Sequence, residues 1–146
     1  MIVAVLLMTV VTHTPLAPCP AAQMQASLDP AVAQTLTSVR SGNAATLLAQ
    51  MSRAGIAFGP DGMLVPYPVL QDQFTKKTGR YCDLFTCKGK AGSLNALFGG
   101  GKTDKSIDAK HNRATVVLNG NTQKELDLGY AYTPQCKWEL TSIGSL

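Results

Sequence analysis

Two stretches near the end of the chain decide the fold: Ala114-Thr115-Val116-Val117-Leu118-Asn119-Gly120 and Leu126-Asp127-Leu128-Gly129-Tyr130-Ala131-Tyr132. The first part is apolar and β-branched and ends in Asn-Gly, the strongest two-residue signal for a β-hairpin. The second part alternates between large apolar residues and small or polar ones, as a strand with one buried face does. Trp138, Leu140 and Ile143 then predict a closing strand. The last third of the chain therefore predicts an antiparallel sheet.

Upstream of this sheet, apolar residues recur at helical spacing. They predict one helix over 29–40, where Asp29 is suited to cap the helix and Pro30 to occupy its first turn. A second helix is predicted over 44–54, ended by Gly55. The two helices are expected to form a hairpin ahead of the sheet.

Between these helices and the sheet lies a mixed segment. Residues 56–58 and 63–65 predict a β-hairpin around the turn Gly59-Pro60-Asp61-Gly62. A third helix is predicted over 68–79, and 81–85 is strand-like. With 146 residues, 45% of them hydrophobic, the chain suits one domain of the α+β class.

The N-terminal segment is typical of an export signal. Ile2–Val11 is an apolar run interrupted only by Thr9; it is too short to span a membrane and is followed by small residues up to Ala22. We therefore expect a signal peptide over 1–22, a single domain over 23–146, and a periplasmic or secreted location. No Lys or Arg precedes the apolar run, and Leu16-Ala17-Pro18-Cys19 is similar to a lipoprotein box, so lipidation of Cys19 stays an alternative.

Four cysteines fit an oxidising compartment. If Cys19 leaves with the signal peptide, the disulfide candidates are Cys82, Cys87 and Cys136, and one thiol is left over. A bond between Cys82 and Cys87 requires a bend between them, and Cys136 bonding to either is the alternative. The C-x4-C spacing does not favour a metal site, so no metal is expected.

A phosphate-loop-like motif, Ala96-Leu97-Phe98-Gly99-Gly100-Gly101-Lys102-Thr103, lies in a glycine- and lysine-rich loop over 88–104. Nucleotide chemistry needs a buried strand before such a loop and a helix after it. Neither flank has the required pattern. We therefore expect no nucleotide partner despite Gly101-Lys102-Thr103, and no cofactor.

The net charge of +4 is concentrated in the middle of the chain. A segment over 76–113 carries nine basic residues against three aspartates. An excess of this kind is suited to an anionic surface, but few aromatic residues accompany it, so nucleic acid is not favoured. The basic residues are Lys76, Lys77, Arg80, Lys88, Lys90, Lys102, Lys105, Lys110 and Arg113.

The order of elements resembles the nuclear-transport-factor-two-like superfamily, also called SnoaL-like or ketosteroid-isomerase-like. The resemblance is carried by Gly55-Ile56-Ala57-Phe58, Arg113-Ala114-Thr115-Val116-Val117, and the ending Lys137-Trp138-Glu139-Leu140-Thr141-Ser142-Ile143. It implies a cone-like fold, with N-terminal helices packed on a strongly curved antiparallel sheet around an apolar cavity. Members of the superfamily include isomerases, dehydratases and hydrolases as well as proteins that only bind, so the fold alone does not give the activity.

The resemblance places any acid or base in the cavity, where burial shifts its pKa. Asp83, with Tyr67 or Tyr81 as hydroxyl donors, is the weak catalytic candidate, and Asp127 is expected to face outward. We expect a non-catalytic binding or accessory module that takes a small apolar ligand or an envelope protein. The alternatives are a cavity enzyme and an interaction module that uses the basic 76–113 segment; a homodimer stays open.

Overall fold

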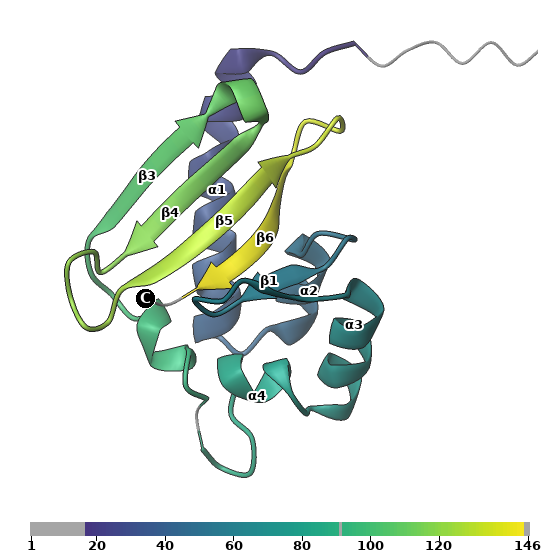
Figure 1. Ribbon diagram of the computed structural model, residues 1–146, viewed down its shortest axis with the longest axis vertical. Helices are drawn as coiled ribbons and strands as arrows, with labels where there is room; N and C mark the ends of the chain where they lie inside the picture. Colours follow the sequence, from purple (N-terminus) through teal and green to yellow (C-terminus); the bar gives the residue numbers. More distant parts are fainter. Residues whose placement is uncertain (1–16, 91, 145–146) are drawn as a thin grey trace, which may run out of the picture.

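The computed structural model describes residues 17–90 and 92–144, and it has one sheet covered by helices on one face (Figure 1). The strands are β1 (Ile56–Phe58), β2 (Met63–Val65), β3 (Thr103–Asp108), β4 (Arg113–Leu118), β5 (Leu126–Tyr132) and β6 (Trp138–Gly144). The helices are α1 (Ala21–Arg40), α2 (Ala44–Gln50), α3 (Tyr67–Lys76) and α4 (Arg80–Leu84), with short 3-10 turns η1 (Asn95–Phe98) and η2 (Ala109–His111). The α+β class is confirmed.

The strands follow the order β2-β1-β6-β5-β4-β3. Neighbouring strands are antiparallel except β1 and β6, which run parallel, so the sheet is mixed where the sequence predicts an antiparallel one. The parallel pair joins the early hairpin to the last strand, a long-range pairing that local patterns do not reveal. The curved sheet is not closed, and with its helices it is compatible with a cone-like fold.

The predicted alternation in β5 is confirmed. Leu126, Leu128, Tyr130 and Tyr132 are buried, and the residues between them are partly exposed. The buried set faces α1, because the Tyr130 hydroxyl donates a hydrogen bond to Thr35 of that helix at 2.9 Å. The space between α1 and the sheet therefore holds the side chains of the core.

Helix α1 begins earlier than predicted, so the expectation of a cap at Asp29 is wrong. The helix starts at Ala21, and Pro30 lies inside it. Met24 and Leu28, which precede the proline, are buried against the sheet, and the Trp138 indole donates a hydrogen bond to the Met24 carbonyl at 2.9 Å. This packing compensates for the loss of one helical hydrogen bond, because Pro30 has no backbone N–H to donate.

Three other local predictions are corrected. Residues 81–85 belong to α4 and its C-cap rather than to a strand, and the rings of Tyr81, Phe74 and Phe85 pack together there. Strand β3 was not predicted because its sequence is polar; it is an edge strand that pairs with β4 alone. Asn119-Gly120 begins a longer loop, in which the Asn119 amide donates hydrogen bonds to the carbonyls of Leu97 and Lys124.

The cysteines form two disulfides, Cys19–Cys136 and Cys82–Cys87. The local Cys82–Cys87 bond is the one that the sequence offers if the segment bends, and α4 supplies the bend. The structure pairs Cys136 with Cys19, whereas the sequence offered Cys136 to Cys82 or Cys87.

The described fold starts before the predicted boundary between residues 22 and 23. A leader ending at Ala22 would take Cys19 and the first residues of α1 with it. The apolar run Ile2–Val11 lies outside the described residues. Among the residues that are described, no helix is long and apolar enough to cross a membrane. Two disulfides fit a protein that folds in an oxidising compartment.

The two disulfides should differ in their effect on stability. Cys19–Cys136 closes a loop of 117 residues, and Cys82–Cys87 closes one of 5. Loop-closure entropy predicts that the free energy of unfolding falls by about 5 kcal/mol in the double variant Cys19→Ser/Cys136→Ser and by about 2 kcal/mol in Cys82→Ser/Cys87→Ser. Denaturant unfolding of both variants beside the oxidised parent measures the difference. Equal losses of unfolding free energy in the two variants would contradict the expectation that Cys19–Cys136 is the more stabilising disulfide.

Candidate functional site

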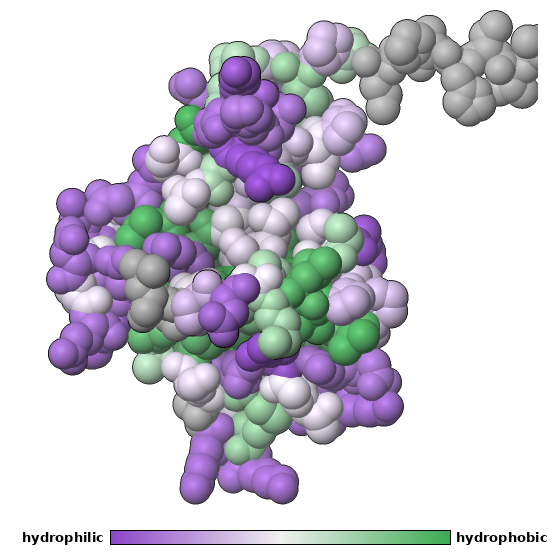
Figure 2. Space-filling model, viewed as in Figure 1, coloured by the Kyte–Doolittle hydropathy of each residue, from purple (hydrophilic) through white to green (hydrophobic). Residues whose placement is uncertain are grey.

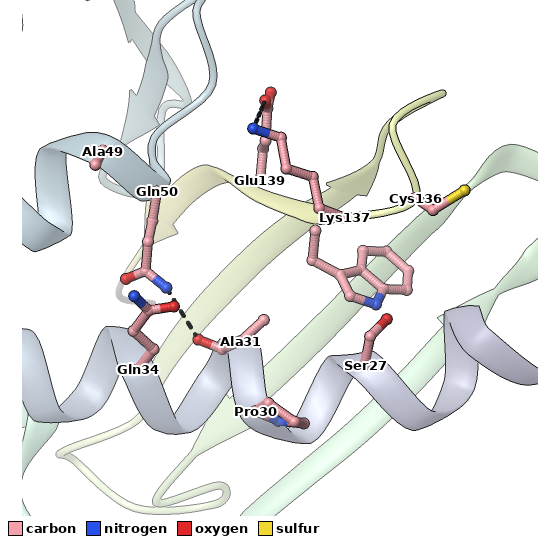
Figure 3. A pocket seen from close by; sticks show the side chains of 10 residues that line it. Ser27, Pro30, Ala31, Gln34, Ala49, Gln50, Cys136, Lys137 and Glu139 are labelled. Atoms are coloured by element: carbon pink, nitrogen blue, oxygen red, sulfur yellow. Dashed lines mark hydrogen bonds and ion pairs between the residues drawn. The ribbon is translucent and has the colours of Figure 1, made fainter. Parts of the chain in front are cut away.

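A groove of about 350 Å³ lies where α1, α2 and the start of β6 meet (Figure 3). It opens to the surface, whereas the sequence analysis expects an apolar cavity inside the sheet. Its lining combines small apolar residues with amide, hydroxyl and charged groups. The lining residues are Ser27, Pro30, Ala31, Gln34, Ala49, Gln50, Cys136, Lys137, Trp138 and Glu139.

Two glutamine side chains form the polar centre of the groove. Gln34 projects from α1 and Gln50 from the end of α2, and Figure 3 shows the two pointing toward each other. The Gln50 amide donates to the Ala31 carbonyl at 3.4 Å, which is at the long limit of a hydrogen bond. The Gln34 side chain makes no hydrogen bond to any other described residue. Both amides therefore keep donor and acceptor capacity for a ligand.

A buried hydrogen-bonded chain supports the groove from inside. The Tyr130 hydroxyl donates to Thr35, whose own hydroxyl lies 3.1 Å from the Ala31 carbonyl and 3.4 Å from the Gln50 amide oxygen. Burial raises the pKa of Tyr130, and the Thr35 hydrogen bond offsets only part of this effect. Tyr130 therefore stays neutral and acts as a fixed polar contact rather than as a base.

The rim of the groove carries one charge of each sign. The Lys137 ammonium lies 3.8 Å from the Glu139 carboxylate, and the Lys137 side chain is 62% exposed. The Glu139 side chain is half-buried, and a pair at this separation is weak. Both residues alternate with Trp138, whose indole reaches α1, and Figure 3 shows their ion pair directed away from Gln34 and Gln50.

The catalytic candidates from the sequence do not converge on this groove. Asp83 and Tyr81 lie on α4, where Asp83 pairs with Arg80 at 2.9 Å and Tyr81 packs against Phe74. Tyr67 begins α3, with the Arg53 guanidinium over its ring. The structure brings Asp83 and Tyr81 onto one short helix but joins neither to Tyr67 in an acid–base arrangement.

The nine basic residues fall on two parts of the fold. Lys76, Lys77, Arg80, Lys88 and Lys90 lie on α3, α4 and the turn that follows, whereas Lys102, Lys105, Lys110 and Arg113 lie on or beside β3 and β4. Four of the nine are in ion pairs, with Asp72, Asp83, Asp104 and Asp29. The charge is therefore divided and partly neutralised.

Gly101-Lys102-Thr103 leads into a strand. Turn η1 precedes the glycines, and β3 begins at Thr103. The strand–loop–helix arrangement of a phosphate loop is not formed by these residues. Among the described residues, no cluster of His, Cys, Asp and Glu side chains has the geometry of a metal site.

Asp127 is the one carboxyl group whose pKa is raised among the described residues. It lies on β5 between Leu126 and Leu128, on the face of the sheet opposite α1, which confirms that it points away from the core. Burial is the main cause of the higher pKa, and the negative charge of Glu125 adds to it. The neighbouring acid, Glu125, accepts a hydrogen bond from the Asn121 backbone N–H in the same loop, so the raised pKa of Asp127 is not a catalytic signature by itself.

The residues that build the groove were not identified from the sequence. Gln34 and Gln50 belong to separate helices, and Trp138 follows them by many residues. Polar residues on an amphipathic helix normally face solvent, so nothing in the pattern marks Gln34. Only the packing of α1 on β6 brings these side chains together.

The comparisons with known proteins add no identification. The chain matches no protein-family model, and no curated protein matches it significantly.

Tyr130 and Tyr132 give a matched pair for testing the buried chain. The Tyr130 hydroxyl is hydrogen bonded to Thr35, whereas the Tyr132 hydroxyl is buried without a partner among the described residues. Tyr130→Phe should lower the free energy of unfolding by about 1 kcal/mol, because a buried hydrogen bond is lost. Tyr132→Phe should leave it unchanged or raise it. Denaturant unfolding measures both, and equal losses would argue against a structural role for the Tyr130–Thr35 bond.

Asp127 should make stability depend on pH. The pKa of Asp127 is raised in the folded state, so the folded protein binds a proton at Asp127 more readily than the unfolded chain does. The contribution of Asp127 to the free energy of unfolding therefore falls as the pH rises through the pKa values of the unfolded and folded states. Asp127→Asn should therefore be more stable than the parent at neutral pH, with a gap that narrows on acidification toward about pH 4. Asp61→Asn, in an exposed turn, controls for the loss of one negative charge. If the difference in unfolding free energy between Asp127→Asn and the parent did not change with pH, this explanation would be wrong.

Proposed function

We propose that this protein is an exported, non-catalytic binding module that holds a short peptide segment in the groove between α1, α2 and β6. The observation that carries the proposal is the convergence of the Gln34 and Gln50 amides over an apolar floor that includes Pro30 and Ala31. A side-chain amide presents a donor and an acceptor side by side, which matches the N–H and C=O groups of a peptide backbone. The predicted signal segment and the two disulfides support a periplasmic or extracellular location.

The size and polarity of the groove narrow the choice of ligand. A volume of about 350 Å³ is at the lower end for ligand pockets, so a segment of two or three residues is the suitable size. The nearly equal presence of polar and apolar groups favours such a ligand over the purely apolar one expected from the family resemblance.

A binding role is supported over a catalytic one by the chemistry of the lining. Amides and a hydroxyl hydrogen bond well but do not transfer protons near neutral pH. The only ionisable groups that line the groove, Lys137 and Glu139, lie at its rim in partial contact with each other. A hydrolase or isomerase needs an acid or base held against the reacting atom, and neither rim group is held in that way.

Tri-alanine with free termini is the probe for this proposal. Its titration into isotope-labelled protein should give saturable NMR shifts at residues 31–34, 50 and 137–139. Gln34→Ala should weaken binding about tenfold through the lost amide contacts and leave the fold intact, because its side chain makes no hydrogen bond to other described residues. Gln71→Ala, on the exposed side of α3, is the matched control and should bind as the parent does.

Blocked termini test whether backbone contacts carry the binding. Tri-alanine with N-acetyl and C-amide groups should bind about as tightly as the free peptide, because the Gln34 and Gln50 amides contact backbone N–H and C=O groups, and Lys137→Ala should leave this binding unchanged. Shifts that map away from the groove, or binding unaffected by Gln34→Ala, would refute the proposed site.

A further inference from the structure

The Cys82–Cys87 disulfide lies in a second surface groove, of about 320 Å³. This groove is formed by the end of α3, by α4 and by the turn after α4, so it is separate from the groove between α1, α2 and β6. Both cysteines line it and are half-buried rather than enclosed in the core. The disulfide is therefore within reach of a small molecule that enters the groove.

The charge beside this disulfide is positive. Lys77 and Lys88 line the groove, both are exposed, and neither forms an ion pair with another described residue. None of the described residues that line the groove is acidic. Figure 2 shows hydrophilic side chains projecting from the lower end of the molecule, where Figure 1 places the turn after α4. Such a groove attracts an anion, and its two cations stabilise a thiolate formed there.

Opening this disulfide leaves α4 in place, because other contacts hold the helix. The Leu84 side chain is fully buried in the core. The rings of Tyr81 and Phe85 pack against each other, and both pack against Phe74 of α3. The chemistry of the two sulfurs can therefore change without loss of the surrounding fold.

The two disulfides also differ in their resistance to reduction. A disulfide that stabilises the folded state is harder to reduce, because that stabilisation is lost when the bond opens. Cys82–Cys87 closes a loop of 5 residues and Cys19–Cys136 one of 117, so the local bond contributes less to stability. Cys82–Cys87 is therefore the more easily opened of the two.

We infer that Cys82–Cys87 is an exchange site for a small anionic thiol, which the groove binds through Lys77 and Lys88. The incoming thiolate attacks one sulfur and forms a mixed disulfide with it, while the Cys82–Cys87 bond breaks and its electron pair passes to the other sulfur. That sulfur is released as a thiolate and takes a proton from water. One disulfide is lost and one is formed, so the step needs no further oxidant or reductant.

The backbone of Lys77 adds a second contact to this site. Its carbonyl oxygen lies 3.4 Å from the Cys82 sulfur and 3.5 Å from the Cys87 sulfur. Whichever sulfur is released can donate its S–H to this carbonyl once it is protonated. The exposed hydroxyls of Thr78 and Thr86, which also line the groove, can donate to the carboxylate of the bound thiol. The groove therefore offers partners to both ends of such a ligand.

Mercaptoacetate, which is anionic, and 2-mercaptoethanol, which is neutral and of similar size, test the inference on the oxidised full chain. Quenching in acid followed by peptide mass mapping measures the rate at which each thiol opens each disulfide. Cys82–Cys87 should open first with both thiols and should pass through a mixed disulfide at one of its two cysteines. Faster opening of Cys19–Cys136 would overturn the inference.

Two double variants with the same change of charge test the role of the lysines. Lys77→Gln/Lys88→Gln should lower the ratio of the mercaptoacetate rate to the 2-mercaptoethanol rate at Cys82–Cys87 about tenfold at low ionic strength. Lys110→Gln/Lys124→Gln, which removes exposed lysines that are also outside ion pairs, should keep the parent's ratio. The intrinsic reactivities of the two thiols cancel when these ratios are compared.

Ionic strength gives a test on the unmodified chain. Raising the salt concentration from about 0.01 M to about 1 M should lower the parent's rate ratio toward that of Lys77→Gln/Lys88→Gln, because the lysine charges are screened. The ratio of Lys77→Gln/Lys88→Gln itself should change much less. A parent ratio that does not depend on salt, or that equals the ratio of Lys77→Gln/Lys88→Gln, would overturn the inference.

Discussion

The structure depends on the attachment of α1 to the far end of the chain. The Cys19–Cys136 disulfide joins the residue two positions before α1 to the turn that precedes β6, and the Trp138 indole binds the Met24 carbonyl beside it. Further along the helix, Thr35 binds the Tyr130 hydroxyl of β5. One covalent bond and two buried hydrogen bonds therefore hold the helix along the sheet. The apolar core forms between these two surfaces, and without the helix one face of the sheet would be open to water.

The same attachment produces the groove. Helix α1 is fixed to β6 by its first turns, while α2 returns along it and ends at Gln50, so the three elements leave a gap that side chains only partly fill. Because Thr35 contacts both Tyr130 and Gln50, the position of a surface amide is coupled to a buried hydrogen bond of the core. Of the two amides in the groove, Gln50 is positioned by these contacts, and a group that is already positioned loses little conformational entropy when it binds a ligand.

Sequence patterns predicted the elements whose apolar residues repeat within one segment. The alternation of β5, the hairpin over 56–65 and the helical character of 29–40 are all present. The errors arise where distant contacts override local preference: Pro30 lies inside α1 because the sheet buries the turns before it, and β3 forms from a polar sequence because β4 pairs with it. The Cys19–Cys136 bond and the groove are long-range features, and no local pattern encodes either.

The short β1–β2 hairpin is better fixed than its length suggests. Strand β1 pairs with β6 on one side and with β2 on the other, so β2 is carried on a central strand of the sheet. At the base of the hairpin, Gly55 has φ +115°, and a Cβ there would clash with the Val65 carbonyl oxygen, so only glycine permits this close approach. The attachment of β1 to β6 and the close approach at Gly55 therefore hold three residues of β2 in the extended conformation, although an isolated two-stranded hairpin is at best marginally stable in water.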